Sequence, residues 1–154
     1  MRYLLLAFCG CLAGTTFVSA AVIAATCGHD VHGAPTIEVT DLGEGSSIMH
    51  YFSPATLIMD DPKDPRHRAF GECRGQAVLT DGQGNWAGSC VWRTTDGDAL
   101  VAHWRSQPGD KGVADGQLHG TATMTGTGKL SSIGGPNSWT GLANGGSYFC
   151  MDEK

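Results

Sequence analysis

The chain has 154 residues, which suits one domain, and a formal net charge of -5 at pH 7. Nucleic acid is excluded as an expected partner, because phosphates attract a basic protein face and this chain is acidic. The same charge argues against an anionic membrane surface, so no membrane contact beyond export is expected.

The first residues have the pattern of a secretory signal peptide. Arg2 is a short positive region, residues 3–12 are apolar, and small residues follow. This apolar part is too short for a spanning helix, which needs about 20 residues. We expect residues 1–24 to be removed, with the boundary between 20 and 26, and residues 25–154 to form one domain. We therefore expect an exported protein, either periplasmic or secreted. The alternatives to a cleaved signal peptide are a lipoprotein lipidated at Cys27 and an uncleaved membrane anchor.

The mature part lacks helical periodicity. Short runs rich in Val, Ile, Thr and aromatic residues are separated by turn pairs. The chain has 23 glycines, all but two of them after the expected signal peptide, and glycine disfavours helices. The predicted strands lie near residues 36–40, 47–52, 56–59, 69–80, 86–95, 99–105, 117–126, 138–142 and 147–150. The predicted turns lie at residues 81–82, 96–97, 108–110 and 134–137. The charged stretch at residues 60–68 is the largest irregular insert, with its charges exposed.

These strands predict an all-β fold. Antiparallel strands in so small a chain need closure or a second sheet to hide their edges. A closed barrel of about eight strands has room inside for side chains or one small ligand. We therefore predict a small antiparallel β-barrel of about eight strands after the signal peptide, with a sandwich as the alternative.

Four cysteines remain after the expected cleavage. They are Cys27, Cys73, Cys90 and Cys150. An even number in an exported chain indicates two disulfides. If Asp81 and Gly82 form a two-residue hairpin turn, facing residues have numbers that sum to 163, as 73 and 90 do. This predicts Cys73–Cys90 and Cys27–Cys150; a longer turn would make the first pair diagonal.

The stretch TMTGTGKLSSIGGPNSW, residues 123–139, looks at first like a phosphate-binding loop. A P-loop needs Gly-Lys followed by Ser or Thr and opens a helix. Here Leu130 follows Lys129, Thr123 stands where the first glycine belongs, and strand patterns flank the loop. The glycines are better explained by backbone geometry where strands bend.

The same stretch resembles the C-terminal half of the allene oxide cyclase and dirigent-like β-barrels. The likeness runs through Gly126-Thr127-Gly128-Lys129, Ile133-Gly134-Gly135 and Trp139, and upstream through residues 88–100 and Trp104. It covers roughly residues 71–141, about half of the chain. The resemblance implies a barrel with a central cavity for a hydrophobic small molecule, and it allows a homo-oligomer, a dimer or a trimer. None of the family's catalytic residues matches a position here.

Alternation along the strands separates two groups of candidate residues. Glu72, Arg74 and Arg93 share one face, opposite the face of Cys73, Cys90 and Trp92. A carboxylate between two arginines is ordinarily a solvated salt network; facing a cavity, it would clamp a carboxylate or handle a proton.

Two further clusters contain histidine and aromatic residues. They are His50-Tyr51 and His103-Trp104. Histidine suits acid–base work, and a cavity lined by Trp, Tyr and His would suit a flat apolar ligand. Core or oligomer-interface packing is the alternative.

The segment CGHDVHG invites a metal interpretation through Cys27, His29 and His32. A structural site normally has four ligands, and a fourth is not evident. Cys27 is better used in a disulfide, so we predict neither a metal nor a cofactor.

Two functions follow as hypotheses. The first is an exported barrel that binds an apolar or aromatic small molecule, through Trp92, Trp104, His50, Arg74 and Arg93. The second is a cofactor-independent cyclase, isomerase or lyase, with His103, Glu72 or Tyr51 moving a proton. They are distinguished by whether one of these three residues faces an enclosed apolar cavity.

Overall fold

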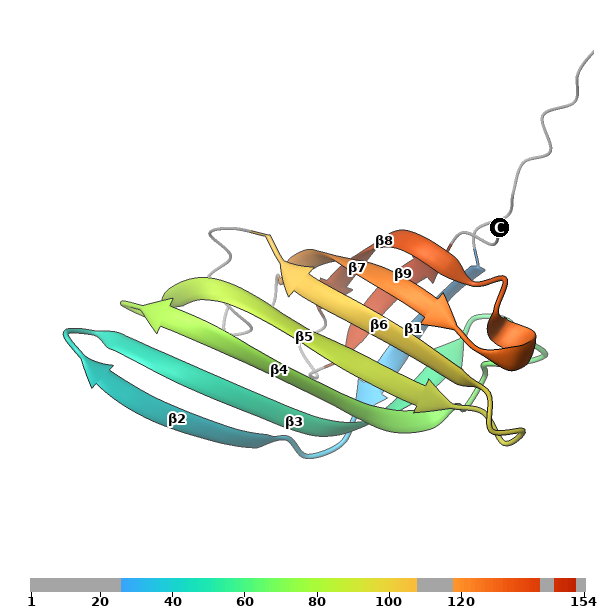
Figure 1. Cartoon of the computed structure of the whole chain (residues 1–154), viewed down its shortest axis with the longest axis horizontal. Helices are drawn as coiled ribbons and strands as arrows, with labels where there is room; N and C mark the ends of the chain where they lie inside the picture. The colour runs from blue at the N-terminus through green and yellow to red at the C-terminus, as the bar shows by residue number, and fades with distance from the viewer. Residues whose placement is uncertain (1–25, 108–117, 142–145, 152–154) are drawn as a thin grey trace, which may run out of the picture.

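A computed structural model describes residues 26–107, 118–141 and 146–151, so the expected signal peptide lies outside the described residues. Within these ranges the strands are β1 (Thr26–His32), β2 (Thr36–Gly43), β3 (Ser46–Met59), β4 (Phe70–Thr80), β5 (Gln83–Arg93), β6 (Ala99–Ser106), β7 (His119–Gly126), β8 (Gly134–Gly141) and β9 (Ser147–Met151). Neighbouring strands pair antiparallel, and β1 closes the barrel by pairing with both β9 and β3 (Figure 1). The prediction of an all-β barrel of eight strands is confirmed, with β2 as an additional strand outside the closed ring.

One edge of the long strand β3 pairs with β4, and its other edge pairs with β2 and then with β1. Its second half lies beside β1 and its first half beside β2, which extends away from the barrel (Figure 1). His32 pairs with Ala55 and Thr36 with Phe52, so residues 33–35 form a bulge opposite two residues of β3. The extra residue reverses the alternation, and even-numbered β1 residues face the same interior as odd-numbered β2 residues.

Two predicted boundaries were wrong. Residues 47–52 and 56–59 belong to one strand, because Pro54 lies beside the bulge. Its carbonyl accepts a hydrogen bond from the Gly33 amide at 2.8 Å, so its missing N–H also faces the bulge rather than β4. The predicted turn at 134–137 lies inside β8, because a short 3₁₀ helix, Gly128–Leu130, already reverses the chain after β7.

The β4–β5 hairpin forms as predicted. Asp81 and Gly82 have φ values of 52° and 75°, as a type I′ turn requires, and Cys73 pairs directly with Cys90. Both predicted disulfides, Cys73–Cys90 and Cys27–Cys150, are present and confirmed. Two disulfides indicate an oxidising, extracytoplasmic environment.

The charged stretch after β3 packs against one end of the barrel. Arg66 is only 2% exposed, and its Nε donates to Asp64 Oδ1 at 2.6 Å. Its guanidinium also reaches the Met151 sulfur. The expectation that all charges in this insert are exposed is therefore wrong, because Arg66 is buried together with its counter-ion. The described residues include no helix long and apolar enough to cross a membrane.

Candidate functional site

The barrel interior contains an apolar cavity of about 250 Å³. All four tryptophans of the chain, Trp86, Trp92, Trp104 and Trp139, line it. Their neighbours on the wall include Ile37, Met49, Leu118, Met124 and Phe149. Trp104 and Trp139 meet edge to face with ring centroids 5.8 Å apart. Such walls suit a flat apolar molecule.

Glycines make room for the largest of these side chains. The strand registers align Tyr51, Gly75, Gly88 and Trp104 in one row across β3 to β6. A Cβ atom on Gly75 would lie 2.7 Å from Cη2 of Trp104, so the indole occupies space that any other residue would fill. The row brings Trp104 toward Tyr51 and shapes the cavity between them.

Three cavity tryptophans have an unpaired donor. The indole N–H groups of Trp86, Trp92 and Trp139 are buried and have no hydrogen-bond partner among the described residues. An indole N–H can only donate, and buried polar groups without partners are uncommon in folded proteins. The three rings thus belong to the cavity wall, while their nitrogen atoms are covered by neighbouring atoms.

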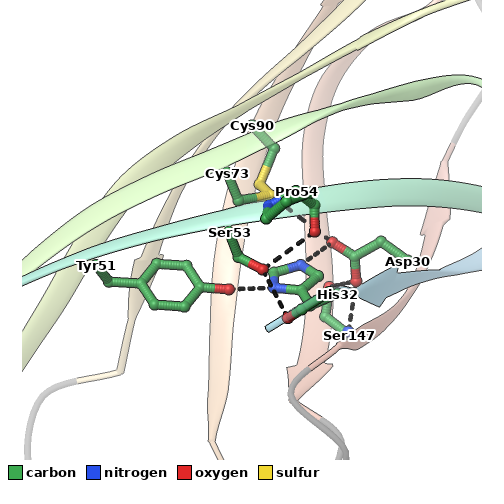
Figure 2. A network of polar contacts seen from close by, with 9 residues as sticks. Asp30, His32, Tyr51, Ser53, Pro54, Cys73, Cys90 and Ser147 are labelled. Atoms are coloured by element: carbon green, nitrogen blue, oxygen red, sulfur yellow. Dashed lines mark hydrogen bonds and ion pairs between the residues drawn. A yellow bond between two sulfur atoms is a disulfide. The ribbon is translucent and has the colours of Figure 1, made fainter. Parts of the chain in front are cut away.

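One part of the wall is polar. Asp30 and His32 come from β1, Tyr51 from β3 and Ser147 from β9, as Figure 2 shows. The Tyr51 hydroxyl is hydrogen-bonded to His32 Nδ1, and His32 Nε2 lies 2.8 Å from Asp30 Oδ2. Ser147, the direct partner of Asp30 across β1 and β9, donates its amide at 2.5 Å and its hydroxyl at 2.8 Å to Asp30 Oδ1. Asp30, although only 2% exposed, is thus fully hydrogen-bonded.

The partners determine where the protons lie. A carboxylate only accepts, so His32 Nε2 must carry the hydrogen that faces Asp30. In the neutral imidazole, Nδ1 then accepts the hydrogen bond from the Tyr51 hydroxyl. A hydroxyl, an imidazole and a carboxylate are thus connected in the order that activates a hydroxyl for proton transfer.

The phenol of Tyr51 is protonated at neutral pH. Burial raises the pKa of Tyr51 to about 12; a hydrogen bond with Ser53 opposes this rise, and the negative charge of Asp30 adds to it. Tyr51 is therefore a hydrogen-bond donor toward His32, while the lone pairs of its oxygen remain able to accept.

The three residues of the rejected metal interpretation, Cys27, His29 and His32, do not converge. Cys27 is in a disulfide. His29 and His32 are three positions apart on β1, so their side chains lie on opposite faces of the strand. Asp30, His32 and Cys73 do have ligand atoms within 4.8 Å of one another. Cys73 is disulfide-bonded, however, so this cluster lacks the thiolate that a metal would bind.

The structure distributes the predicted site residues over both faces of the barrel. Tyr51, Trp92 and Trp104 line the cavity. His103, Arg93 and His50 are exposed, and Arg74 is paired with Glu72 at 2.9 Å in an exposed ion pair. The Arg74 guanidinium lies 5.1 Å from the centroid of the Phe52 ring. Glu72 and His103 therefore lie outside the cavity. Their catalytic role stays a prediction, and no contact in the structure supports it.

Sequence reasoning missed Asp30 as a site residue and considered His32 only as a metal ligand. The signal was present, because two polar residues spaced by two share one face of a strand. It was not used because residues 26–32 were not predicted to be a strand.

A scan against protein-family models finds no match, and no curated protein is significantly similar in sequence. The structure shows an eight-stranded antiparallel barrel with one additional strand and an apolar cavity inside it.

Proposed function

We propose that the protein binds one flat apolar or aromatic small molecule, with a single polar group, inside the barrel. The observation that carries this proposal is the apolar cavity of about 250 Å³ into which the chain places all four of its tryptophans. Ligand sites in proteins are mostly apolar concavities with a few converging polar groups, and this cavity has that composition.

The polar group of the ligand has a suitable partner. The Tyr51 hydroxyl lies in an otherwise apolar wall, and because its proton is donated to His32, its oxygen can accept a hydrogen bond from the ligand. A hydroxyl group on the ligand would donate to this oxygen, and this favours binding over an equally apolar molecule without a hydroxyl group.

The wider setting is proposed on the same basis. The glycine-rich stretch and the barrel support kinship with the allene oxide cyclase and dirigent-like barrels. The signal-like N-terminus supports export to the periplasm or the exterior. A homo-oligomer stays a prediction.

The test is calorimetric titration with 2-naphthol, a flat apolar molecule with one hydroxyl. Naphthalene serves as the matched ligand without oxygen. Saturable binding of one 2-naphthol per chain is expected, weaker for naphthalene. Ala122→Phe fills the cavity and should abolish binding, whereas Thr123→Phe places the same ring on the outer face of β7 and should not. Equal binding by both variants would contradict the proposal.

A further inference from the structure

We propose that Tyr51, His32 and Asp30 form a proton relay that makes the cavity an active site for proton transfer. The substrate class is an apolar carbonyl compound with an acidic C–H next to the carbonyl group. This inference rests on the proposed function, because such a substrate must first bind in the cavity.

The relay contains every titratable group that faces the cavity among the described residues. Asp30 and His32 lie on β1 and Tyr51 reaches them from β3. From β9 the cluster meets Ser147, which is neutral, and on the β4 and β5 side it meets the Cys73–Cys90 disulfide, which has no thiol to titrate (Figure 2). Within the described part of the chain, a proton taken from a bound substrate can therefore be passed only along these three side chains.

The hydrogen bonds have the direction that proton abstraction needs. The Tyr51 hydroxyl proton points to His32 Nδ1, and His32 Nε2–H is held 2.8 Å from Asp30 Oδ2. When His32 accepts a second proton, the Asp30 carboxylate stabilises the imidazolium, and both oxygens of that carboxylate already have donors. The positive charge that develops on His32 during the reaction is thus stabilised by the Asp30 carboxylate, which is already in position.

The step balances without a cofactor. The substrate α-proton moves to the Tyr51 oxygen while the Tyr51 proton moves to His32 Nδ1, and the C–H electron pair becomes the enolate. The step leaves a negative charge on the enolate oxygen and a positive charge on the His32 imidazolium. Return of the proton by the same path to the α-carbon gives exchange. Return to the conjugated γ-carbon of an unsaturated substrate shifts its double bond, which is an isomerisation.

The three residues have different roles. Tyr51 contacts the substrate and is the catalytic residue. His32 receives the proton from Tyr51. Asp30 is a positioning residue, which fixes the imidazole tautomer and is itself held by Ser147.

The experiment follows deuterium incorporation into 2-tetralone in D₂O by proton NMR. This ketone matches 2-naphthol in shape, so binding and turnover are measured on similar molecules. The wild-type protein should accelerate exchange with saturation. Tyr51→Phe should lower the maximal rate constant about 100-fold or more, as loss of acid–base catalysis does. Its dissociation constant for 2-naphthol should rise less than about tenfold, as expected for one lost hydrogen bond.

Tyr148→Phe is the matched control, because Tyr148 lies on the exposed face of β9 and its hydroxyl is bonded to Asp60. It should exchange 2-tetralone at the wild-type rate. Asp30→Asn should lower the maximal rate constant with little change in KM, a separation that a general loss of structure does not produce. His32→Gln should likewise lower the maximal rate constant, because an amide side chain cannot take up the proton from Tyr51.

Each failure has a different meaning. Binding of 2-naphthol without accelerated exchange, or a Tyr51→Phe variant as active as the wild type, overturns the relay and leaves the binding function standing. A wild-type protein that binds no 2-naphthol overturns the proposed function and the relay with it.

Discussion

The indole ring of Trp104 on β6 lies over the α-carbon of Gly75 on β4, two strands away. Gly88 on the intervening β5 lets the ring cross, since a Cβ atom there would lie 2.5 Å from Cζ2 of Trp104. The cavity thus depends on missing side chains as much as on the tryptophans that line it.

Gly75→Ala should disturb this arrangement. The added methyl group would push the Trp104 ring into the cavity, so 2-naphthol affinity should fall at least tenfold in calorimetry. Overpacking of this kind lowers the free energy of unfolding by about 1–3 kcal/mol. Gly33→Ala is the control, because its Cβ would have only ordinary contacts with Pro54 at 3.6 Å. Unchanged affinity in Gly75→Ala would show that Trp104 does not shape the binding site.

The buried pair of Arg66 and Asp64 should contribute far more than the exposed pair of Arg74 and Glu72. The side chains of the first pair are 2% and 7% exposed, and those of the second 69% and 45%. Arg66→Met leaves the Asp64 carboxylate buried without its counter-ion, which should lower the free energy of unfolding by about 3–5 kcal/mol. Arg74→Met should change it by less than about 1 kcal/mol. Urea unfolding of both variants decides, and equal effects would mean that burial of Arg66 is unimportant.

The same pair should make stability depend on acid. Burial alone would raise the pKa of Asp64, but the hydrogen bonds and positive charge of Arg66 outweigh it and hold that pKa below its usual value of 3.8. This contribution to stability is present above pH 3.8 and is lost as the pH falls through the lower folded-state value. Asp64→Asn should remove this part of the acid dependence, measured as urea midpoints between neutral and acidic pH. An unchanged dependence would be the contrary result.

Alkaline pH should destabilise the protein through Tyr51. Burial raises the pKa of Tyr51 from 10.0 to about 12 in the folded state, so the unfolded chain ionises first. The resulting stability is fully present below pH 10 and is lost as the pH rises toward about 12. The free energy of unfolding should therefore fall more steeply over this window in the wild type than in Tyr51→Phe. Tyr148 is common to both proteins, so it cannot produce a difference between them.

The disulfide Cys27–Cys150 should stabilise the chain without shaping the cavity. It joins β1 to β9 across a sequence separation of 123 residues, and neither residue lines the cavity. Removing it by Cys27→Ser with Cys150→Ser should lower the free energy of unfolding by about 3–5 kcal/mol, since a long loop is released in the unfolded chain. Affinity for 2-naphthol should stay at the wild-type level under conditions where the variant is folded. A loss of affinity in the folded variant would place Cys27–Cys150 among the determinants of the site.

The β4–β5 hairpin was predictable because its signals are local. Asp81-Gly82 has the residue types of a type I′ turn, and the turn determines the register that pairs Cys73 with Cys90. The alternation of β4 and β5 correctly predicted that Trp92 shares a face with the disulfide, and the structure shows that this face is buried.

Asp30 and His32 were harder to identify as site residues, because their position depends on how β1 pairs with distant strands. β1 places Gly28, Asp30 and His32 inward, so it lacks the apolar alternation by which strands are recognised. The bulge at residues 33–35 depends on pairing with β3, which no pattern in the segment itself reveals. Tyr51 could be identified as a candidate from its residue type alone. Its hydrogen bond to His32, however, forms only because β1 pairs with β3 when the barrel closes.

Binding of a ligand in the tryptophan-lined cavity is tested most directly by the indole N–H signals of the four tryptophans in a ¹H–¹⁵N correlation spectrum. Because all four tryptophans line the cavity, 2-naphthol bound there must change their surroundings. We predict that the signals of Trp86, Trp92 and Trp139, whose N–H groups are unpaired among the described residues, move on titration and saturate at one equivalent. Indole signals that stay in place while 2-naphthol binds would show that the ligand lies elsewhere, and would contradict the account.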